Sequence, residues 1–350
     1  MALIDQVAPL PRWWSFPDAA PGAYLSTQDE AGMGDRAGWM AEAERERGLA
    51  GTCFITMGPW ISPLGIERFA PPAGGGCTLG LSWNLNPEEG GIFRPSGFWR
   101  FQPIHRQVSL PEQVEWFSQL TEKPVRVTRS FDLRWTDEWA GPFQQLAAAK
   151  VSIDSSYGPS GGRGQGYLFG TGLPFRVLDA RGLPLGELRE IPFLVSFEGR
   201  HLARETLERL LQQSAELYHQ AVVSRLSPAG FVTDPDVELY RMWKESFATA
   251  RKLGMWITDL QTYQLFLAAR QEGVLSSTFR NGMLLATAQA VAERQTLALP
   301  AQWAGRPAGP VTVDGREAHP IRLRGIGGDL LLLPLERGTH SVVIEYVELP

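Results

Sequence analysis

The chain has 350 residues and a mass of 38.7 kDa, which is enough for a barrel-sized domain and a smaller second one. Hydrophobic residues make up 43% and charged residues 20%, a composition that excludes an intrinsically disordered chain. The formal net charge is −5 and basic and acidic residues are interspersed, so we expect no nucleic-acid partner.

The sequence carries no pattern of a targeting or membrane segment. The first residues lack a basic stretch followed by an apolar core, and no apolar run approaches the roughly 20 residues that span a bilayer. The two cysteines, Cys53 and Cys77, lie in apolar, strand-like segments, which favours buried free thiols over a disulfide. Together these features predict a cytoplasmic protein without a membrane span.

The stretch from residue 23 to residue 58 predicts a strand, a helix and a second strand. Residues 23–28 have the apolar and β-branched content of a buried strand, Asp35 to Arg47 has a helical pattern, and residues 51–58 read as the next strand. Such a unit implies parallel strands joined by a right-handed crossover. Asp29 and Glu30 follow the first strand at its carboxyl end, where α/β folds carry their chemistry.

Strand and helix patterns continue to alternate up to about residue 271. Further strands are predicted at 77–82, 124–130, 150–156, 189–197, 221–228 and 254–260, and further helices at 109–121, 141–149, 203–220 and 235–253. The helix at 109–121 has a capping box, in which Ser109 precedes the helix and Glu112 follows three residues later. This alternation predicts an α/β fold built on a seven- or eight-stranded (β/α) barrel.

The pattern changes near Gln271 to short strands separated by turns. These strands are predicted at 297–303, 310–318, 320–324, 329–335 and 340–349, and Asp314-Gly315 is a strong hairpin signal. The run at 330–335 is apolar on both faces, so that strand should be covered on both sides. We therefore predict an N-terminal arm at 1–22 that wraps the barrel irregularly, a barrel at 23–271 and a small antiparallel β domain at 272–350.

Polar residues gather at the predicted carboxyl ends of the strands, where a barrel protein builds its site. The candidates for catalysis are Asp29, Glu30 and Asp154, and the candidates for substrate binding are Arg129, Ser82, Ser227 and the sugar-stacking rings of Trp83 and Trp256. Because neighbouring carboxylates need a balancing charge, Arg129 is expected to pair with Asp29 or Asp154. No histidine lies at these strand ends.

The stretch that contains Asp29 resembles the first motif of the polysaccharide deacetylases, which remove acetyl groups from N-acetylated sugars. Thr27, Gln28, Asp29 and Glu30 stand where that family has T-F-D-D, and Gly51 to Phe54 stand where it has A-T-F-F. The later stretches GLSWN, TRSFDLRW, DSSYG and LSP follow in the family's order, so the resemblance covers roughly residues 20–270. It implies a zinc-dependent deacetylase in which Asp29 is the catalytic base and Glu30 a metal ligand.

The chain departs from that family at the positions of its histidines. Ser82 and Asn86 stand where the resemblance would place two zinc-binding histidines, and Ser227 stands before Pro228 where it would place the general acid. Zinc prefers imidazole, thiolate and carboxylate donors to a hydroxyl or an amide oxygen. We therefore expect no metal and no other cofactor, and a pseudoenzyme that binds a carbohydrate or glycoconjugate or acts as a partner subunit.

Two other functions stay open, so the sequence does not decide whether the protein is an enzyme. The first is a carboxylate-based glycosidase, in which Asp29 and Glu30 act with Asp154 or Glu190 as an acid and base pair. The second is an active deacetylase with atypical metal ligands.

Overall fold

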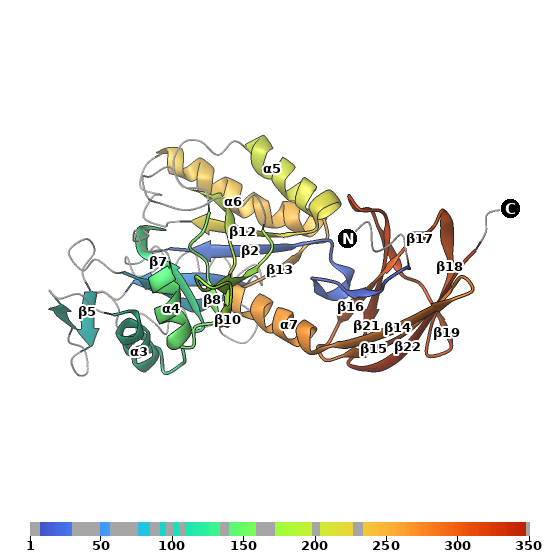
Figure 1. Ribbon diagram of the computed structural model, residues 1–350. Helices are drawn as coiled ribbons and strands as arrows, with labels where there is room; N and C mark the ends of the chain where they lie inside the picture. The colour runs from blue at the N-terminus through green and yellow to red at the C-terminus, as the bar shows by residue number, and fades with distance from the viewer. Residues whose placement is uncertain are drawn as a thin grey trace.

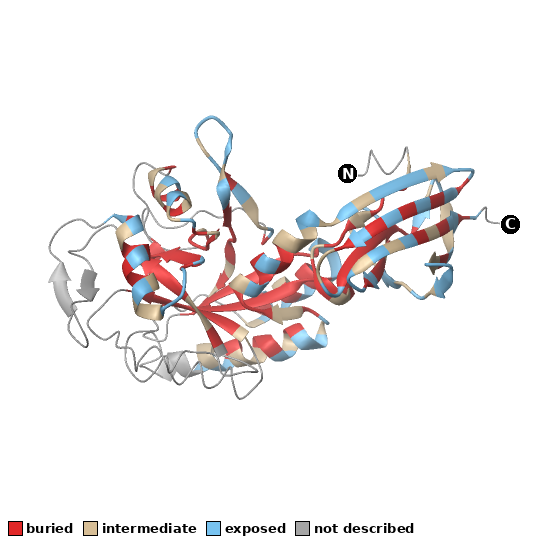
Figure 2. Ribbon diagram, turned by 90° about the horizontal axis from the view of Figure 1, so that it is seen from below, coloured by how far each residue is buried: buried red, intermediate tan, exposed pale blue. Residues whose placement is uncertain are grey.

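The structure is a computed structural model that describes residues 8–29, 50–56, 76–84, 92–95, 101–104, 109–133, 140–158, 172–197, 204–226 and 234–347. It shows a mixed α/β protein with a parallel central sheet at one end and antiparallel sheets at the other (Figure 1). Most of the central sheet and of the helix faces turned toward it is buried, whereas the strand at 283–290 near the C-terminal end alternates between exposed and buried residues (Figure 2).

The central sheet has ten strands in the described part of the chain, in the order β11-β12-β2-β3-β4-β7-β8-β10-β9, with β13 also paired to β2. Every pairing is parallel except that of β9 with β10. The strands are β2 (Ala23–Gln28), β3 (Ala50–Thr56), β4 (Gly76–Trp83), β7 (Val127–Ser130), β8 (Ile153–Asp154), β9 (Phe175–Leu178), β10 (Pro184–Glu190), β11 (Phe193–Ser196), β12 (Ala221–Leu226) and β13 (Trp256–Thr258).

The parallel pairing of β2 with β3 confirms the two strands of the predicted opening unit. The helix predicted from Asp35 to Arg47 lies outside the described residues. The predicted sixth strand is divided into β10, which pairs with β8, and β11, which pairs with β12. The structure therefore shows a parallel sheet of the expected strand content, while a closed barrel remains a prediction.

Helices lie above and below the strands of the central sheet in the view of Figure 1. They are α3 (Leu110–Thr121), α4 (Ala140–Ala148), α5 (Arg204–Gln213), α6 (Asp234–Lys252) and α7 (Leu260–Glu272), with a π-helical turn at Ser214–Tyr218 and 3₁₀ turns at Pro17–Ala19 and Phe131–Leu133. The predicted capping box begins α3, because the Glu112 N–H donates to Ser109 Oγ and the Ser109 N–H donates to Glu112 Oε2. The sequence analysis did not predict α7.

Residues of the parallel strands alternate between two faces, and this alternation decides which side chains can meet. Leu25, Phe54, Val127, Ile153 and Val223, from five different strands, belong to one cluster, which we call the inner face. The intervening residues form the outer face. On it, β3 and β4 pack against α3 and α4, whereas β2 and β12 pack against α5 and α6.

The antiparallel strands follow α7 and form two sheets. The four-stranded sheet has β1 (Arg12–Trp13), β16 (Gln295–Pro300), β21 (Leu330–Leu335) and β20 (Ile321–Leu323). The six-stranded sheet has β14 (Val274–Arg280), β15 (Met283–Ala290), β22 (Gly338–Tyr346), β18 (Arg306–Val313), β17 (Gln302–Trp303) and β19 (Arg316–Ala318). A separate pair joins β5 (Ile92–Pro95) and β6 (Phe101–Ile104).

Three hairpins in the six-stranded sheet have two-residue turns whose second residue is glycine, at 281–282, 304–305 and 314–315. The predicted turn at Asp314-Gly315 joins β18 to β19, with φ values of 51° and 78°. Asn281-Gly282 joins β14 to β15 with φ values of 51° and 77°, a hairpin that the sequence analysis missed. Positive φ at both central residues is the geometry that favours Asn-Gly and Asp-Gly in two-residue turns.

The described part of the N-terminal arm predicted at 1–22 contains one short strand. Arg12 and Trp13 form β1, which pairs with β16, and Trp13 packs in the core of the C-terminal sheets. The strand β21 is covered on both faces, as predicted, because Leu332 packs under the parallel sheet and Leu333 packs with the C-terminal core. The domain boundaries themselves stay a prediction.

The prediction of two free thiols is wrong, because Cys53 and Cys77 form a disulfide with a Cα–Cα distance of 5.6 Å. They lie on the neighbouring parallel strands β3 and β4, where Cys53 pairs with Leu79 and Cys77 with Gly51. An offset of two residues keeps both side chains on the outer face and within reach of each other. Sequence spacing alone does not show this proximity.

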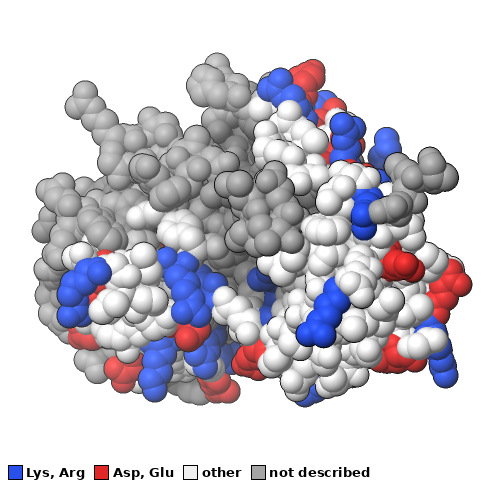
Figure 3. Space-filling view, turned by 45° about the vertical axis from the view of Figure 1, so that its right-hand side comes forward, with Lys and Arg blue, Asp and Glu red and all other residues white. Residues whose placement is uncertain are grey.

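Lysine and arginine side chains are mixed with aspartate and glutamate on the face shown in Figure 3. Among the helices that the structure describes, none combines the length and the apolar character needed to cross a bilayer.

Candidate functional site

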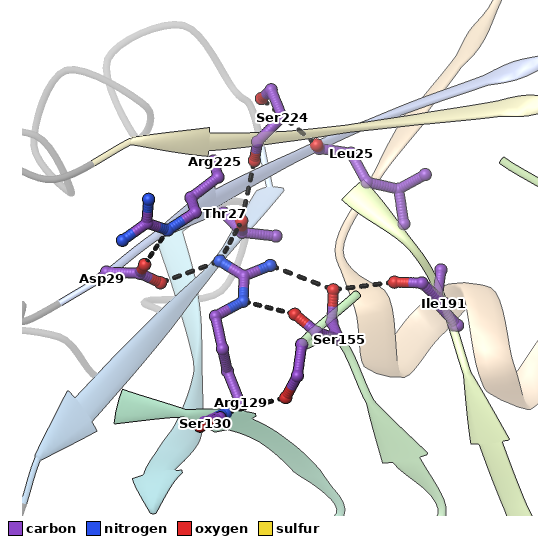
Figure 4. A network of polar contacts seen from close by, with 10 residues as sticks. Leu25, Thr27, Asp29, Arg129, Ser130, Ser155, Ile191, Ser224 and Arg225 are labelled. Carbon is purple, nitrogen blue, oxygen red and sulfur yellow. Dashed lines mark hydrogen bonds and ion pairs between the residues drawn. The ribbon is translucent and has the colours of Figure 1, made fainter. Parts of the chain in front are cut away.

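A buried network of charged side chains lies on the inner face at the carboxyl ends of the parallel strands (Figure 4). Asp29 follows β2, and its N–H donates to Leu226 O on β12 at 2.8 Å. Arg129 Nη1 donates to Asp29 Oδ1 at 2.8 Å, and Arg225 Nε donates to Asp29 Oδ2. One carboxylate therefore holds two guanidinium groups, one on each oxygen, and we call these three residues with Thr27 and Ser155 the arginine network.

The arginines set the protonation state of Asp29. Burial by itself raises the pKa of this carboxyl, but the charges and hydrogen bonds of Arg225 and Arg129 outweigh burial and hold its pKa below the usual range. Asp29 is only 7% exposed, so little water competes for its oxygens. It is a carboxylate at neutral pH and a weak proton acceptor.

Arg129 is held in place by nearly all its donors. Its Nη1 also donates to Thr27 Oγ1 at 2.8 Å, its Nε donates to Ser155 O at 2.6 Å, and its Nη2 donates to Ser155 Oγ at 2.9 Å. The guanidinium carbon lies 4.3 Å from the centre of the Phe54 ring, in a cation–π contact. Arg129 is therefore a rigid part of the site, and of its two expected partners it pairs with Asp29.

Two hydroxyl side chains lie at the same ends of the strands between Asp29 and Arg129. Thr56 ends β3 on the inner face, two residues after Phe54, and Ser82 lies opposite both Thr56 and Arg129 in the strand register. The Thr56 side chain is buried, and its Oγ1 has no hydrogen-bond partner in the described structure. Ser82 is thus a direct strand neighbour of Arg129 in the network.

Asp154 does not join the arginine network, although its position at the end of β8 suggested that it would. Its Oδ1 accepts from Thr128 Oγ1 at 2.7 Å and from Trp83 Nε1 at 3.1 Å, and both of these residues lie on the outer face. Ser155, the next residue in the chain, occupies the inner position instead. Alternation along the strands has placed Asp154 and Trp83 on the face opposite to Asp29.

Asp154 instead forms a buried carboxyl pair with Glu190. The two residues are register partners on β8 and β10, and neither side chain is exposed. Burial raises the pKa of Glu190 well above its usual range, and the charge and hydrogen bond of Asp154 raise it further; burial also raises the pKa of Asp154. Neither Asp154 Oδ2 nor Glu190 Oε2 has a hydrogen-bond partner in the described structure, and a single proton held between them would satisfy both.

Trp256, a predicted sugar-stacking residue, is not at the network. Trp256 pairs with Ala23 at the amino end of β2, and its ring contacts Tyr263 and Phe266, so it lies at the opposite end of the strand from Asp29. Glu30 and Ser227 lie outside the described residues.

The described donors of the site do not fit a zinc ion. They are serine and threonine hydroxyls and one carboxylate that already binds two arginines, and a guanidinium group repels a metal ion. In the part of the chain that the structure describes, there is no group of three or more His, Cys, Asp or Glu side chains able to hold a metal. Because Glu30 and Asn86 lie outside that part, the absence of a metal stays a prediction.

The sequence analysis missed Arg225. A strand was predicted at 221–228, but Ser227 was chosen as its site residue. Arg225 is the last residue of β12 whose side chain lies on the inner face. The signal was present in AVVSRL, because period-two alternation places Arg225 on the same face as Val223. An arginine in an otherwise apolar and small-residue strand marks a charged partner nearby.

Comparisons with known proteins show weak structural similarity only. No family model and no curated protein sequence matches the chain. A structure described as a polysaccharide deacetylase from Mycobacterium smegmatis superimposes with a TM-score of 0.46 and 14% identity, covering 74% of this chain and 94% of that one. A GH30 endoxylanase from Clostridium papyrosolvens aligns with a TM-score of 0.30 and 7% identity over 95% of this chain and 98% of its own. An alpha-L-fucosidase aligns with a TM-score of 0.23 and 12% identity over 88% of this chain and 66% of its own.

Proposed function

We propose that this protein binds a carbohydrate or glycoconjugate at the carboxyl end of its parallel sheet, without zinc-dependent deacetylation. The proposal draws on the polysaccharide-deacetylase-like motifs, whose described parts fall on successive strands. The TQD of the first motif ends β2, GTCF lies in β3, LSW ends β4 and DSS begins in β8. Of the residues that the resemblance would make functional, Asp29 and Ser82 are described, and both lie at the carboxyl ends of their strands.

The state of Asp29 is the observation that carries this proposal. The resemblance would make Asp29 a catalytic base, and a general base works best with a pKa near the working pH and a lone pair directed at water. Here both carboxylate oxygens are occupied by arginines and the pKa is lowered. Such a carboxylate organises a binding site better than it removes a proton.

The structure supports the hypothesis of a carboxylate-based glycosidase less than it supports carbohydrate binding. Glycosidases hold two carboxyl groups about 5 to 10 Å apart, on either side of the scissile bond. Asp29 and Asp154 face opposite sides of the sheet, and the Asp154–Glu190 pair is wholly buried with its members hydrogen-bonded to each other. In the described residues, no sugar has access between two such carboxyls.

We also propose that the parallel sheet closes into a barrel, with β10 and β11 acting together as its sixth strand. Between these strands the Ile191 N–H donates to Asp154 O at 2.9 Å and the Phe193 N–H donates to Tyr157 O at 2.9 Å, which extends the pairing with β8. β11 then pairs with β12. A ring of this kind places the arginine network at its mouth.

Elemental analysis together with an acetate-release assay on N-acetylated sugar oligomers tests the proposed function. We expect far less than one zinc per chain and no acetate release, with or without added zinc, while calorimetry detects oligosaccharide binding. Asp29→Asn serves as the matched control, because it removes the only described candidate base of the arginine network. One zinc per wild-type chain with acetate release that zinc stimulates and Asp29→Asn abolishes would contradict the proposal.

A further inference from the structure

We propose that the protein binds a phosphate group at a second site, where β9, β10 and the last turn of α7 meet. The residues of this site are Arg176, Arg189, Tyr263 and Arg270, which we call the cationic cluster. None of them belongs to the arginine network, so the inference does not depend on carbohydrate binding.

Arg189 connects the parallel sheet to the end of α7. It lies on β10, and its Nη2 donates to Gln271 Oε1 in the last turn of α7 at 2.6 Å. The residue before Gln271 is Arg270, whose Nε and Nη2 donate to Trp13 O at 3.1 Å and 2.6 Å. Figure 1 shows α7 beside β10, on its way from the parallel sheet to the antiparallel sheets. Two arginines therefore lie at one junction of the fold.

A third arginine lies opposite Arg189. Arg176 on β9 is its register partner in the antiparallel pair of β9 and β10, so the two side chains share a face. Like charges directly opposite each other destabilise a pair of strands. The described carboxylate whose charge acts on Arg189 is that of Glu187, which is exposed and forms no ion pair with it in the described structure. The positive charge of the cluster is therefore only partly balanced.

Burial strengthens the repulsion between these cations. Arg189 is only 6% exposed. Burial lowers its pKa, the charge of Arg176 lowers it further, and Glu187 offsets this only in part. Burial likewise lowers the pKa of Arg270, which Tyr263 raises and the charge of Arg189 lowers. A bound anion would relieve the strain that these charges put on the fold.

Two buried groups of the cluster have no hydrogen-bond partner among the described residues, namely Arg189 Nε and the hydroxyl of Tyr263. The Tyr263 ring is fixed against Phe16 and Trp256, with ring centres 6.3 Å and 5.9 Å away. Burial raises the pKa of the hydroxyl, and the charges of Arg270 and Arg189 offset burial only in part, so the phenol keeps its proton and is a donor. An unpaired buried donor destabilises a fold, and a ligand that accepts from both groups removes that cost.

A phosphate group fits this set of donors and charges. Three arginines and Glu187 leave two positive charges, and a phosphate monoester carries a charge of about −1.5 to −2 near neutral pH. Its three terminal oxygens accept from guanidinium and phenol groups, whereas a carboxylate has two oxygens and one charge. Arg176 is exposed and Arg270 is half-buried, so the phosphate can enter from the surface and reach Arg189.

Calorimetric titration of the full chain with inorganic phosphate, glycerol 3-phosphate and acetate tests this inference. We expect saturable binding of one phosphate group per chain and binding of acetate that is at least about tenfold weaker, because acetate lacks the second charge and the third acceptor. Tighter binding of glycerol 3-phosphate than of inorganic phosphate identifies the ligand as an ester, and the reverse order identifies it as free phosphate. Acetate that binds as tightly as phosphate would overturn the assignment.

Variants locate the bound phosphate. Arg176→Gln should weaken phosphate binding by at least about tenfold, the factor that a hydrogen bond to a charged group contributes. Tyr263→Phe keeps the ring and removes the hydroxyl, so it should weaken phosphate binding by about threefold to tenfold. Arg181→Gln is the matched control and should bind phosphate as the wild type does, because Arg181 is an exposed arginine in the turn between the same two strands and pairs with Asp179.

Thermal unfolding provides an independent measurement on Tyr263→Phe. Without phosphate, this variant should unfold at the same temperature as the wild type or a higher one, because no buried hydroxyl is left unpaired. With phosphate, its melting temperature should rise less than that of the wild type. A variant that is less stable without phosphate would show that the hydroxyl already has a partner, and this would contradict the site.

The inference fails if neither phosphate probe shows saturable binding. It also fails if phosphate binds with unchanged affinity to both Arg176→Gln and Tyr263→Phe, because the anion is then bound elsewhere. Arg189→Gln should abolish phosphate binding. If that variant does not fold, Arg176→Gln and Tyr263→Phe still decide, since one changes an exposed side chain and the other preserves the packing of the ring.

Discussion

Glu190→Gln should make the protein more stable above neutral pH, because it replaces a carboxyl that has to keep its proton. In the wild type, Glu190 and Asp154 are in-register neighbours without exposed surface, and the pKa values of both are raised. A glutamine keeps the oxygen that accepts from the Tyr157 N–H at 2.9 Å, and its amide N–H can donate permanently to Asp154 Oδ2. The substitution therefore imitates the protonated form of Glu190.

The sign of the pH dependence follows from the raised pKa. Above the ordinary glutamate range the unfolded chain releases its proton while the folded chain still binds it, so stability falls as pH rises. The contribution of Glu190 is fully present below that range and is lost as pH rises through the raised pKa. Above it, two buried charges on strands about 4.8 Å apart repel each other by about 3 to 4 kcal/mol at an effective dielectric constant of about 20.

Urea unfolding of wild type and Glu190→Gln from pH 5 to pH 9 measures this difference. We expect similar free energies of unfolding at the acidic end and a gap that opens with pH, in favour of Glu190→Gln, toward about 3 kcal/mol. Glu187→Gln is the matched control, because Glu187 is an exposed glutamate on the same strand. Parallel curves, or a variant that is less stable at every pH, would refute the shared proton.

Two further predictions concern the disulfide and a histidine in the C-terminal sheet. Alkylation and mass spectrometry of the unreduced, unfolded protein should show no free thiol. The double variant Cys53→Ala/Cys77→Ala should lower the free energy of unfolding by about 3 kcal/mol. Two alkylated cysteines would contradict the disulfide and favour the cytoplasmic location predicted from the sequence. For His340, burial lowers the pKa, but its hydrogen bonds to Asp314 and Glu336 O and the charge of Asp314 outweigh burial and raise it. NMR titration should show that the pKa of His340 is lower in Asp314→Asn than in the wild type. In the wild type, the pairing stabilises the fold below the ordinary histidine range, and this stability is lost as pH rises through the raised pKa. An unchanged titration in Asp314→Asn would rule out this pairing.

The sequence predicted those structural elements that depend on interactions between residues close together in the chain. The capping box at Ser109 and the Asp314-Gly315 turn depend on a few neighbouring residues, and both form as predicted. The buried strands β2, β3 and β12 were evident because a strand buried on both faces reads as a continuous run of apolar and small residues. The Asn281-Gly282 hairpin carries the same Asx-Gly sequence signal, although it was not predicted.

The partners within the site were decided by the tertiary structure. Side chains along a strand alternate between the two faces, so the position of a residue in its strand decides its face. Asp154 therefore lies outside the arginine network, whereas Ser155 and Arg225 belong to it. The disulfide likewise depends on which strands are neighbours and in which register. The sequence pattern shows which residues of a strand share a face. Which distant strands pair, however, depends on burying the apolar faces of all strands at once. Only that packing brings Arg129 and Arg225 onto the one carboxylate of Asp29.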